Sequence, residues 1–474
     1  MMTRIKPNQG TVIANNTYKK HTELTEIEIE EGTTEIGCFA FWGCTGLTRV
    51  TLPDSMKKIG ENAFYGCASL AEVTIPDSVT EIGERAFSSC TSLTKISLPN
   101  GLKRISDCAF FNCTGLSYVD IPTSVEEIGH DAFHGCTGLT CVVIPNNVKE
   151  IDHWAFTGCT ALESAKIADG VTRIGSRAFE RCTALADIRI PASMEEIGDA
   201  AFEGCQHISR MVVKNRLVCW NDAAGDILIP NGITAIQESA FFGCAGVTSV
   251  VIPDSVREIG PSAFYGCTNL ANVSIPDSVE EIGQCVFWEC SLLPRIVHKE
   301  ILICWNDANG DIIVPEGIKY VLGGAFARCT SLTSVMLPNG VTEIGDLAFY
   351  GCTGLTGISI PDSMEYIGSS AFNGCTSLKN INIPDGVTKI ECFAFKGCKS
   401  LKNIVIPDGV TEIEAETFEG CANLTDITIP DSVRYICSDA FVHCPKLDKV
   451  AIPAKVQIFG KAFDDHTVLK RKKV

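Results

Sequence analysis

The chain has 474 residues, of which 45% are apolar, so it is long enough to bury a substantial core. Its 39 basic and 57 acidic residues give a net charge of −18, which makes phosphate backbones and anionic membrane surfaces poor partners. The sequence contains no uncharged stretch of about 18 apolar residues, so no membrane span is predicted. Residues 1–30 lack the apolar run of a classical secretory signal.

Residues 1–23 stand outside the pattern that fills the rest of the chain, and we predict that they form an N-terminal cap. From residue 24 to residue 469 the sequence repeats with a step of 23 residues. Seventeen of the 25 cysteines keep this step: Cys44, Cys67, Cys90, Cys113, Cys136, Cys159, Cys182, Cys205, Cys244, Cys267, Cys290, Cys329, Cys352, Cys375, Cys398, Cys421 and Cys444.

Each repeat has the same internal order, for which residues 79–99 serve as the example. Val79–Ile82 predicts a short strand that ends at a glycine, and the following Ala-Phe-x-x-Cys segment predicts an irregular or helical turn. Leu93–Leu98 alternates apolar and polar residues as a half-buried strand does, and Pro99 removes the next backbone donor. Because one repeat cannot bury its apolar side alone, about 18 such units are predicted to stack as one solenoid with a parallel sheet on one face.

The step is interrupted twice, between Cys205 and Cys244 and between Cys290 and Cys329, where 16 residues are added near 214–229 and 299–314. The added segments resemble each other, as Val218–Ile227 and Ile303–Ile312 show. Their Asn-Asp-Ala-x-Gly-Asp centres lie between extended apolar residues, which predicts two β-hairpin inserts with their turns at these centres.

The inserts offer two candidate sites. Trp220 and Trp305 are candidate contact residues for a protein partner if the hairpins project, although packing over the edge of the solenoid is the preferred interpretation. The oxygen donors of Asn306–Asp311 are compatible with Ca²⁺, but a plain turn is preferred because the acidic spacing of a calcium loop is missing.

The last repeat ends with Ala462-Phe463 and has His466 near the place of the cysteine. We expect the basic residues in 470–474 to form a solvated tail rather than a localisation signal.

The repeats resemble those of the BspA-like leucine-rich repeat family, whose units read like IPDSVTEIGERAFSSCTSLTKIS in this chain. The resemblance extends over about residues 24–469 and implies a right-handed solenoid. It also implies a surface or secreted protein of host-associated bacteria or anaerobic protists, with roles in adhesion to matrix proteins or host cells. The absence of a visible signal or anchor leaves a cytoplasmic location as the alternative.

The regularly spaced cysteines are predicted to be buried, reduced core residues, because leucine-rich repeats commonly place Asn or Cys inside the turn after the strand. Disulfides between successive coils are the alternative that spacing alone leaves open. No C-x-x-C motif suggests structural zinc. Among the other cysteines, Cys141 is the best candidate for an accessible thiol.

Neither a catalytic motif nor a cofactor motif is found, so we expect no enzyme, no cofactor and no metal. His130 and His153 share one repeat position, with His134 nearby. This arrangement is compatible with a weak transition-metal site, but a solvated edge is the preferred interpretation.

The outward strand positions are the remaining candidate sites for binding a protein. They include Arg49, Lys95, Tyr118, Asn380 and Asn382. The sequence therefore predicts a nonenzymatic protein-binding scaffold, with the resemblance implying host matrix or receptor proteins as partners. An intracellular leucine-rich-repeat scaffold is the alternative; neither nucleic acid nor a membrane is an expected partner.

Overall fold

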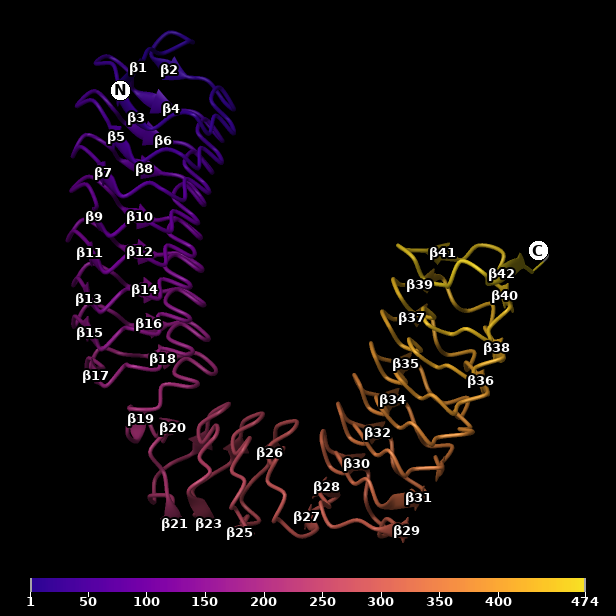
Figure 1. Cartoon of the computed structure of the whole chain (residues 1–474). Coiled ribbons are helices and arrows are strands. Elements are labelled where there is room, and N and C mark those ends of the chain that lie inside the picture. Colours follow the sequence, from indigo (N-terminus) through magenta and orange to yellow (C-terminus); the bar gives the residue numbers. More distant parts are fainter. Residues whose placement is uncertain (1, 473–474) are drawn as a thin grey trace. The chain divides into compact units, whose positions relative to one another are not determined.

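The computed structural model describes residues 2–472, and its regular elements are all short β-strands. The described residues contain no helix, so the turns that follow the short strands are irregular rather than helical. By contacts the chain forms two units, one made of residues 1–223 and 236–242 and the other of residues 224–235 and 243–474. In each unit, successive coils contribute one strand to each of two layers (Figure 1).

We call the first layer the long-strand layer. Its strands are β1 (Met2–Ile5), β3 (Glu26–Ile29), β5 (Arg49–Thr51), β7 (Glu72–Thr74), β9 (Lys95–Ser97), β11 (Tyr118–Asp120), β13 (Cys141–Ile144), β15 (Ser164–Ile167), β17 (Asp187–Arg189), β21 (Gly225–Leu228), β23 (Val247–Val251), β25 (Asn272–Ser274), β29 (Gly310–Ile313), β31 (Leu332–Met336), β33 (Gly357–Ser359), β36 (Asn403–Val405), β38 (Asp426–Thr428), β40 (Lys449–Ile452) and β42 (Val468–Arg471).

The short-strand layer follows the turn after each proline. Its strands are β2 (Val12–Ile13), β4 (Glu35–Ile36), β6 (Lys58–Ile59), β8 (Glu81–Ile82), β10 (Arg104–Ile105), β12 (Glu127–Ile128), β14 (Glu150–Ile151), β16 (Arg173–Ile174), β18 (Glu196–Ile197), β22 (Ala235–Ile236), β24 (Glu258–Ile259), β26 (Glu281–Ile282), β30 (Tyr320–Val321), β32 (Glu343–Ile344), β34 (Tyr366–Ile367), β35 (Lys389–Ile390), β37 (Glu412–Ile413), β39 (Tyr435–Ile436) and β41 (Gln457–Ile458).

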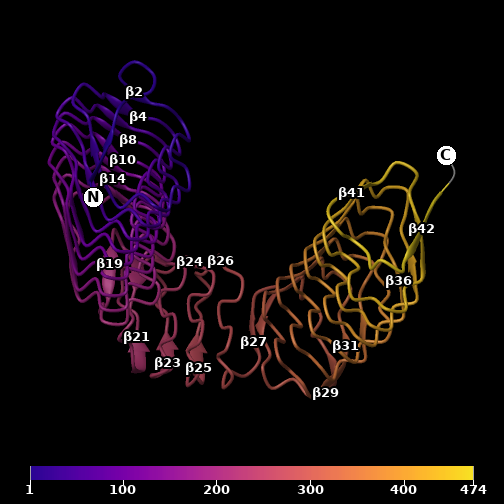
Figure 2. The ribbon, with the colours of Figure 1, turned by 45° about the horizontal axis from the view of Figure 1, so that its top comes forward.

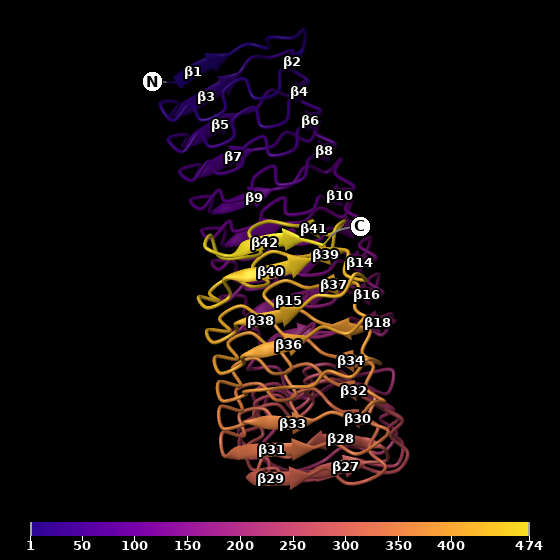
Figure 3. The same cartoon turned by 90° about the vertical axis from the view of Figure 1, so that its right-hand side faces the viewer.

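Within both layers, neighbouring coils pair in parallel, and regular repeats keep the 23-residue register. Near the C-terminus β39 and β41 pair with a step of 22 residues. Lys95 lies beside Tyr118, for example, and Glu127 lies beside Glu150. The strands of successive coils lie side by side in the second unit, where β36, β38 and β40 form one row and β37, β39 and β41 the other (Figure 3). The predicted parallel solenoid is confirmed.

The third side of each coil joins its neighbours without regular strands. The amide of Phe41 donates to the carbonyl of Ala63 at 2.8 Å, and that of Phe64 donates to Ala86 at 2.8 Å. Figure 2 shows the successive coils of the first unit as loops that lie over one another. Hydrogen bonds therefore link successive coils on all three sides, which satisfies backbone groups that would otherwise be buried unpaired.

A column of phenylalanine rings runs through the core of each unit. The centroids of Phe349 and Phe372 are 5.2 Å apart and the rings are almost parallel, and Phe372 and Phe395 repeat the arrangement at 5.3 Å. In the first unit the column begins at Tyr18, whose ring stacks on Phe41 at 5.2 Å. Tyr18 precedes Phe41 by one step of 23 residues, so residues 2–23 build a coil of the same kind although their sequence hides it.

The interrupted repeats contain antiparallel hairpins, but not at the expected place. Strand β19 (Met211–Val213) pairs with β20 (Arg216–Cys219), and β27 (Ile296–His298) pairs with β28 (Ile301–Cys304). Their turns are at residues 214–215 and 299–300, whereas the Asn-Asp-Ala-x-Gly-Asp centres connect β20 to β21 and β28 to β29. The predicted turn position was therefore wrong.

The 16 added residues instead supply an extra, abbreviated coil. In the second unit β28 pairs in parallel with β30 in the short-strand layer, and β29 pairs with β31 in the long-strand layer. In this coil the Asn-Asp centre takes the place of the longer turn between the short and long strands. Asn306 fixes it to the preceding coil by donating its side-chain amide to the carbonyl of Cys290 at 2.9 Å. Trp305 stands where other coils have phenylalanine, with its ring 5.8 Å from that of Phe326.

The basic C-terminal residues are also part of the fold. Strand β42 pairs in parallel with β40 and includes Lys470 and Arg471, so the solenoid extends past residue 469. Arg471 Nη1 donates to the carbonyls of Pro453, Ala454 and Val456 at 2.8–3.4 Å. The end of the last coil is thus closed by a side chain that pairs with its carbonyl groups. Residues 473–474 of the predicted tail lie outside the described residues.

Candidate protein-binding face

The outer face of the long-strand layer presents two side chains from each coil. On β5, β7, β9 and β11 the middle residue is buried and its two neighbours are exposed. This alternation follows from the two-residue period of a strand with one face in the core. Within each unit, the parallel register places equivalent side chains of neighbouring strands side by side in two rows, so a partner would meet several coils rather than single residues.

The structure places most of the predicted contact residues on this face. Arg49, Lys95 and Tyr118 are exposed; Arg49 lies 3.6 Å from Glu72 on the next strand, and Tyr118 is beside Lys95. Asn380 and Asn382 are exposed too, on a segment to which no strand is assigned. Cys141 is half-buried at an outward position of β13.

The exposed apolar pairs at the two abbreviated coils are a feature of this face that was not predicted from the sequence. Leu228 and Ile313 are 69% and 71% exposed, and each lies beside another exposed apolar residue, Val251 or Met336 respectively. Further exposed apolar side chains of this face are Tyr118, Val143 and Val405. Leu228 and Ile313 occupy the same place in the two abbreviated coils. The duplication of the two inserted segments is visible in the sequence. The outward position of Leu228 and Ile313 could be recognised only once β21 and β29 were placed in the long-strand layer.

The two tryptophans of the inserts are half-buried rather than projecting. Trp305 lies between Phe326 and the guanidinium of Arg295, whose Cζ is 4.8 Å from the ring centroid. Trp220 has the equivalent arrangement with Phe241 and Arg210. One ring face therefore packs on the phenylalanine column, which leaves less of each indole for a partner than a projecting hairpin would.

The oxygen groups of the Asn306–Asp311 segment face different partners. Asp311 accepts hydrogen bonds of 2.6 Å from the hydroxyls of Ser334 and Thr333, which lower the pKa of its carboxyl group. The Asn306 amide points to backbone carbonyls of the preceding coil. These contacts account for both side chains as parts of the coil, so they give the calcium alternative no support.

The regularly spaced cysteines have a specific bonding role in addition to filling the core. Cys90 is fully buried, and its Sγ donates to the carbonyl of Phe64 in the preceding coil at 3.3 Å. The same contact recurs along the column, as in Cys136 to Phe110 and Cys375 to Phe349. All cysteines are free thiols in the structure. The thiol is thus a small apolar group that also satisfies a buried carbonyl oxygen.

The three histidines that the sequence placed near one another have different environments. His130 and His134 both contact Asp131, whereas Nδ1 of His153 accepts a hydrogen bond from the amide of Ser176 at 3.0 Å.

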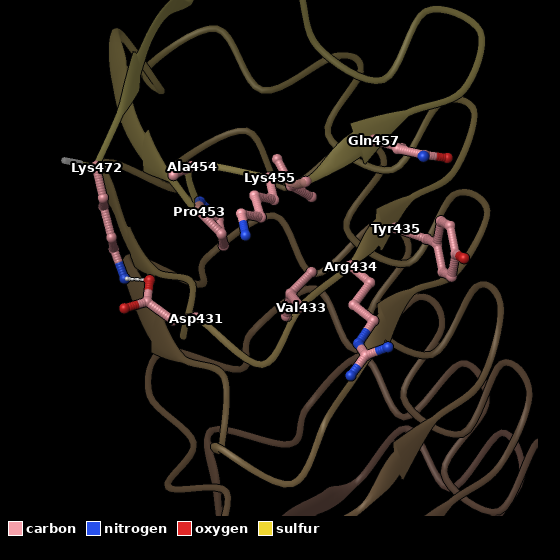
Figure 4. Close-up of a pocket in the computed structure, with 10 residues that line it drawn as sticks. Asp431, Val433, Arg434, Tyr435, Pro453, Ala454, Lys455, Gln457 and Lys472 are labelled. Atoms are coloured by element: carbon pink, nitrogen blue, oxygen red, sulfur yellow. Dashed lines mark hydrogen bonds and ion pairs between the residues drawn. The ribbon is translucent and has the colours of Figure 1, made fainter. Parts of the chain in front are cut away.

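A cavity of about 550 Å³ lies at the C-terminal end of the second unit. Asp431, Arg434, Lys455 and Lys472 are among its lining residues, and the Lys472 ammonium points to the carboxylate of Asp431 at 3.0 Å (Figure 4). Since this ion pair closes one side and the other lining groups come from the last coils, we regard the cavity as part of the closing structure of the solenoid.

No helix among the described residues could cross a membrane.

Several leucine-rich repeat proteins of solved structure are similar to this chain. A leucine-rich repeat protein from Bacteroides ovatus ATCC 8483 is 25% identical over 100% of this chain and 92% of its own, with a TM-score of 0.40. A leucine rich cell surface protein from Faecalibacterium prausnitzii A2-165 is 32% identical over 78% and 86% of the two chains, with a TM-score of 0.42. The T. pallidum leucine-rich repeat protein is 33% identical over 39% and 84%, with a TM-score of 0.33.

No curated protein matches the chain. The family model for the BspA type leucine rich repeat region matches residues 11–140, 126–224, 215–309, 303–391 and 342–470. These ranges cover almost every coil of both units. The chain therefore belongs to the BspA-type leucine-rich repeat family.

Proposed function

We propose that the chain is a nonenzymatic, adhesin-like protein of the cell surface that binds protein partners through the outer face of the long-strand layer. The observation that carries the proposal is the gathering of exposed apolar side chains there, in pairs at the two abbreviated coils. Apolar side chains surrounded by polar ones are typical of protein-binding surfaces, whereas isolated exposed apolar residues are not informative.

The pairs Leu228–Val251 and Ile313–Met336 supply the apolar centres of this surface. Hydroxyl and carboxylate groups border them, with Asp311 held by Ser334 and Thr333. The rest of the face is mainly polar, with Tyr118, Val143 and Val405 as further exposed apolar side chains. A broad contact with several weak points of attachment therefore fits it better than a single deep anchor. Matrix proteins, which offer extended surfaces, are the partner class that the family resemblance implies.

The experiment measures binding of the full chain to a panel of purified extracellular-matrix proteins by biolayer interferometry. The double variant Leu228→Asp/Ile313→Asp should weaken binding to the matched partner at least tenfold, because each new carboxylate would have to be desolvated in the interface. Tyr320→Asp is the matched control, since Tyr320 is 40% exposed on the short-strand layer. Binding that both variants retain equally would contradict the proposed face.

The location is tested separately by protease shaving of intact cells that produce the protein. Release of its peptides before lysis is the expected result. Complete protection would contradict the surface location and favour the intracellular scaffold, a reading that the free thiols would suit.

A further inference from the structure

A thiol, an imidazole and a carboxylate converge on the third side of two successive coils in the first unit. Candidate ligand atoms of Cys108, His130 and Asp131 all lie within 4.8 Å of one another. Cys108 and Asp131 occupy the same repeat position, one step of 23 residues apart, and both have a left-handed backbone, with φ of 53° and 55°. His130 directly precedes Asp131, so the group draws on two coils.

Asp131 is the centre of the group. Its side chain is only 17% exposed, and its two oxygens face the Nδ1 atoms of His130 at 2.9 Å and His134 at 2.7 Å. In the described part of the chain, these two imidazoles are its ion-pair partners. The contact with His134 is a hydrogen bond. Since ligand atoms around a tetrahedral zinc ion are about 3.3–3.8 Å apart, a cation bound by Cys108, His130 and Asp131 would require only a small outward movement of these side chains.

The surrounding structure holds these side chains in place. Cys108 is 6% exposed, and its amide donates to the carbonyl of His130 at 2.8 Å. The ring of His130 lies 5.0 Å from that of Trp154, and the ring of His134 lies 4.8 Å from that of Phe111. Packed neighbours of this kind reduce the rotamer freedom that a ligand set must lose on binding a metal.

We propose that Cys108, His130 and Asp131 form a binding site for a late first-row divalent cation, with Zn²⁺ as the preferred ion. Thiolate and imidazole ligands select zinc or cobalt over calcium and magnesium, which prefer oxygen. On binding, the Cys108 thiol releases its proton and forms a sulfur–metal bond, and the coordinating nitrogen of His130 must be unprotonated.

His134 is a positioning residue in this site, because it holds the second oxygen of Asp131. Three protein ligands leave a fourth position for water or for a donor group of a partner. The ion would join two coils through side chains, in addition to the backbone hydrogen bonds between them. Glu412, Glu414 and Cys437 form a second close group, but it contains no imidazole and serves as the comparison.

The test uses the full chain, stripped of metal under reducing conditions and titrated with Zn²⁺ alone by calorimetry and equilibrium dialysis. The wild type should bind one equivalent more than Cys108→Ser or Asp131→Asn, and Zn²⁺ should raise the thermal midpoint of the wild type but not of these variants. With Co²⁺, the thiolate-to-cobalt absorption band should be lost in Cys108→Ser. His134→Ala should bind about 10–100-fold more weakly.

Cys437→Ser is the matched control and should retain the full stoichiometry. If Cys108→Ser does not fold, Asp131→Asn decides the result, since its side chain is partly exposed and keeps its shape. Equal Zn²⁺ binding by wild type and Asp131→Asn, or no Zn²⁺ bound by the wild type, would overturn the proposal. Matrix-protein binding is measured in parallel and distinguishes failure of this site from failure of the proposed function.

Discussion

At the scale of single residues, the recurrence of cysteine at one repeat position is explained by two properties that few side chains combine. It is small and apolar enough for the core, and its thiol donates to the phenylalanine carbonyl of the preceding coil, as in Cys113 to Phe87 at 3.1 Å. Serine would donate a hydrogen bond but is more polar, and alanine would leave the carbonyl with only its backbone hydrogen bond, from the amide of Cys90 at 3.2 Å. Burial, the predicted property, is confirmed, and the hydrogen bond adds the reason for the residue type.

These thiols predict how stability depends on pH. Burial raises the pKa of Cys113, Cys159 and Cys375 to about 12, above the unfolded value of 9.0. Their raised pKa means that the unfolded chain releases protons first as pH rises, so stability is full below about pH 9 and falls above it. Each thiol lowers the free energy of unfolding by about 1.4 kcal/mol per pH unit in that window.

Urea unfolding at pH 8, 9 and 10 with a reductant measures this effect. The midpoint should fall steeply above pH 9 in the wild type and less steeply in Cys113→Ser. Cys141→Ser, which changes a half-buried thiol outside the column, should keep the wild-type slope. An equal midpoint at all three pH values would contradict the assignment.

At the scale of elements, the irregular turn between the short and long strands depends on backbone conformations that most residues disfavour. The residue before the repeated cysteine is glycine in many coils, as at Gly397 with φ of 69°. Ser89 takes the same position with φ of 61°. Other residues there also keep a positive φ: Asn112, Arg181, Glu289, Arg328 and His443. The hydrogen bonds between coils thus hold non-glycine residues in the left-handed region.

Reciprocal substitutions at this turn test that conclusion. Ser89→Gly should raise the free energy of unfolding by about 0.5–1 kcal/mol, because it removes left-handed strain at a small entropic cost. Gly397→Ser should lower it by about 1–2 kcal/mol. A Cβ at Gly397 would make only ordinary contact, 3.8 Å from the Gly374 backbone, so strain and not crowding is measured. Urea midpoints that move in the opposite directions would refute this account.

At the scale of the whole molecule, each unit is a stack in which a coil depends mainly on its two neighbours. A coil inside the stack has a partner on both sides, while the last one has a partner on one side only. In the second unit, Phe395 stacks between Phe372 and Phe418, at 5.3 and 5.4 Å. Among the described residues, Phe463 stacks on Phe441 alone.

Loss of these two rings should therefore have different consequences. Phe395→Ala should reduce the free energy of unfolding by about 3–5 kcal/mol, because it leaves a cavity with neighbours on both sides. Phe463→Ala should cost less than half as much and should raise hydrogen exchange only in the last coils. Hydrogen-exchange mass spectrometry with urea unfolding measures both. Equal costs at the two positions would contradict nearest-neighbour stacking.

The sequence alone determined the repeat, the parallel strands and the buried columns, because the same 23-residue pattern of Leu93, Phe87 and Cys90 recurs with its turn chemistry in nearly every unit. It placed Lys95 and Tyr118 outward correctly, since a strand with one buried face has a strict two-residue period.

Only the tertiary structure decided what happens where the repeat changes. The residues of the Asn-Asp-Ala-x-Gly-Asp segment favour a turn both in a hairpin and in a short coil. The pairing of β28 with β30 and of β29 with β31 selects the coil. As a result of that pairing, the Trp305 ring packs against Phe326 at the end of the phenylalanine column, and the Ile313 side chain faces outward. The same reason explains the group at Asp131, since the thiol and the imidazole meet the carboxylate only because successive coils stack in register.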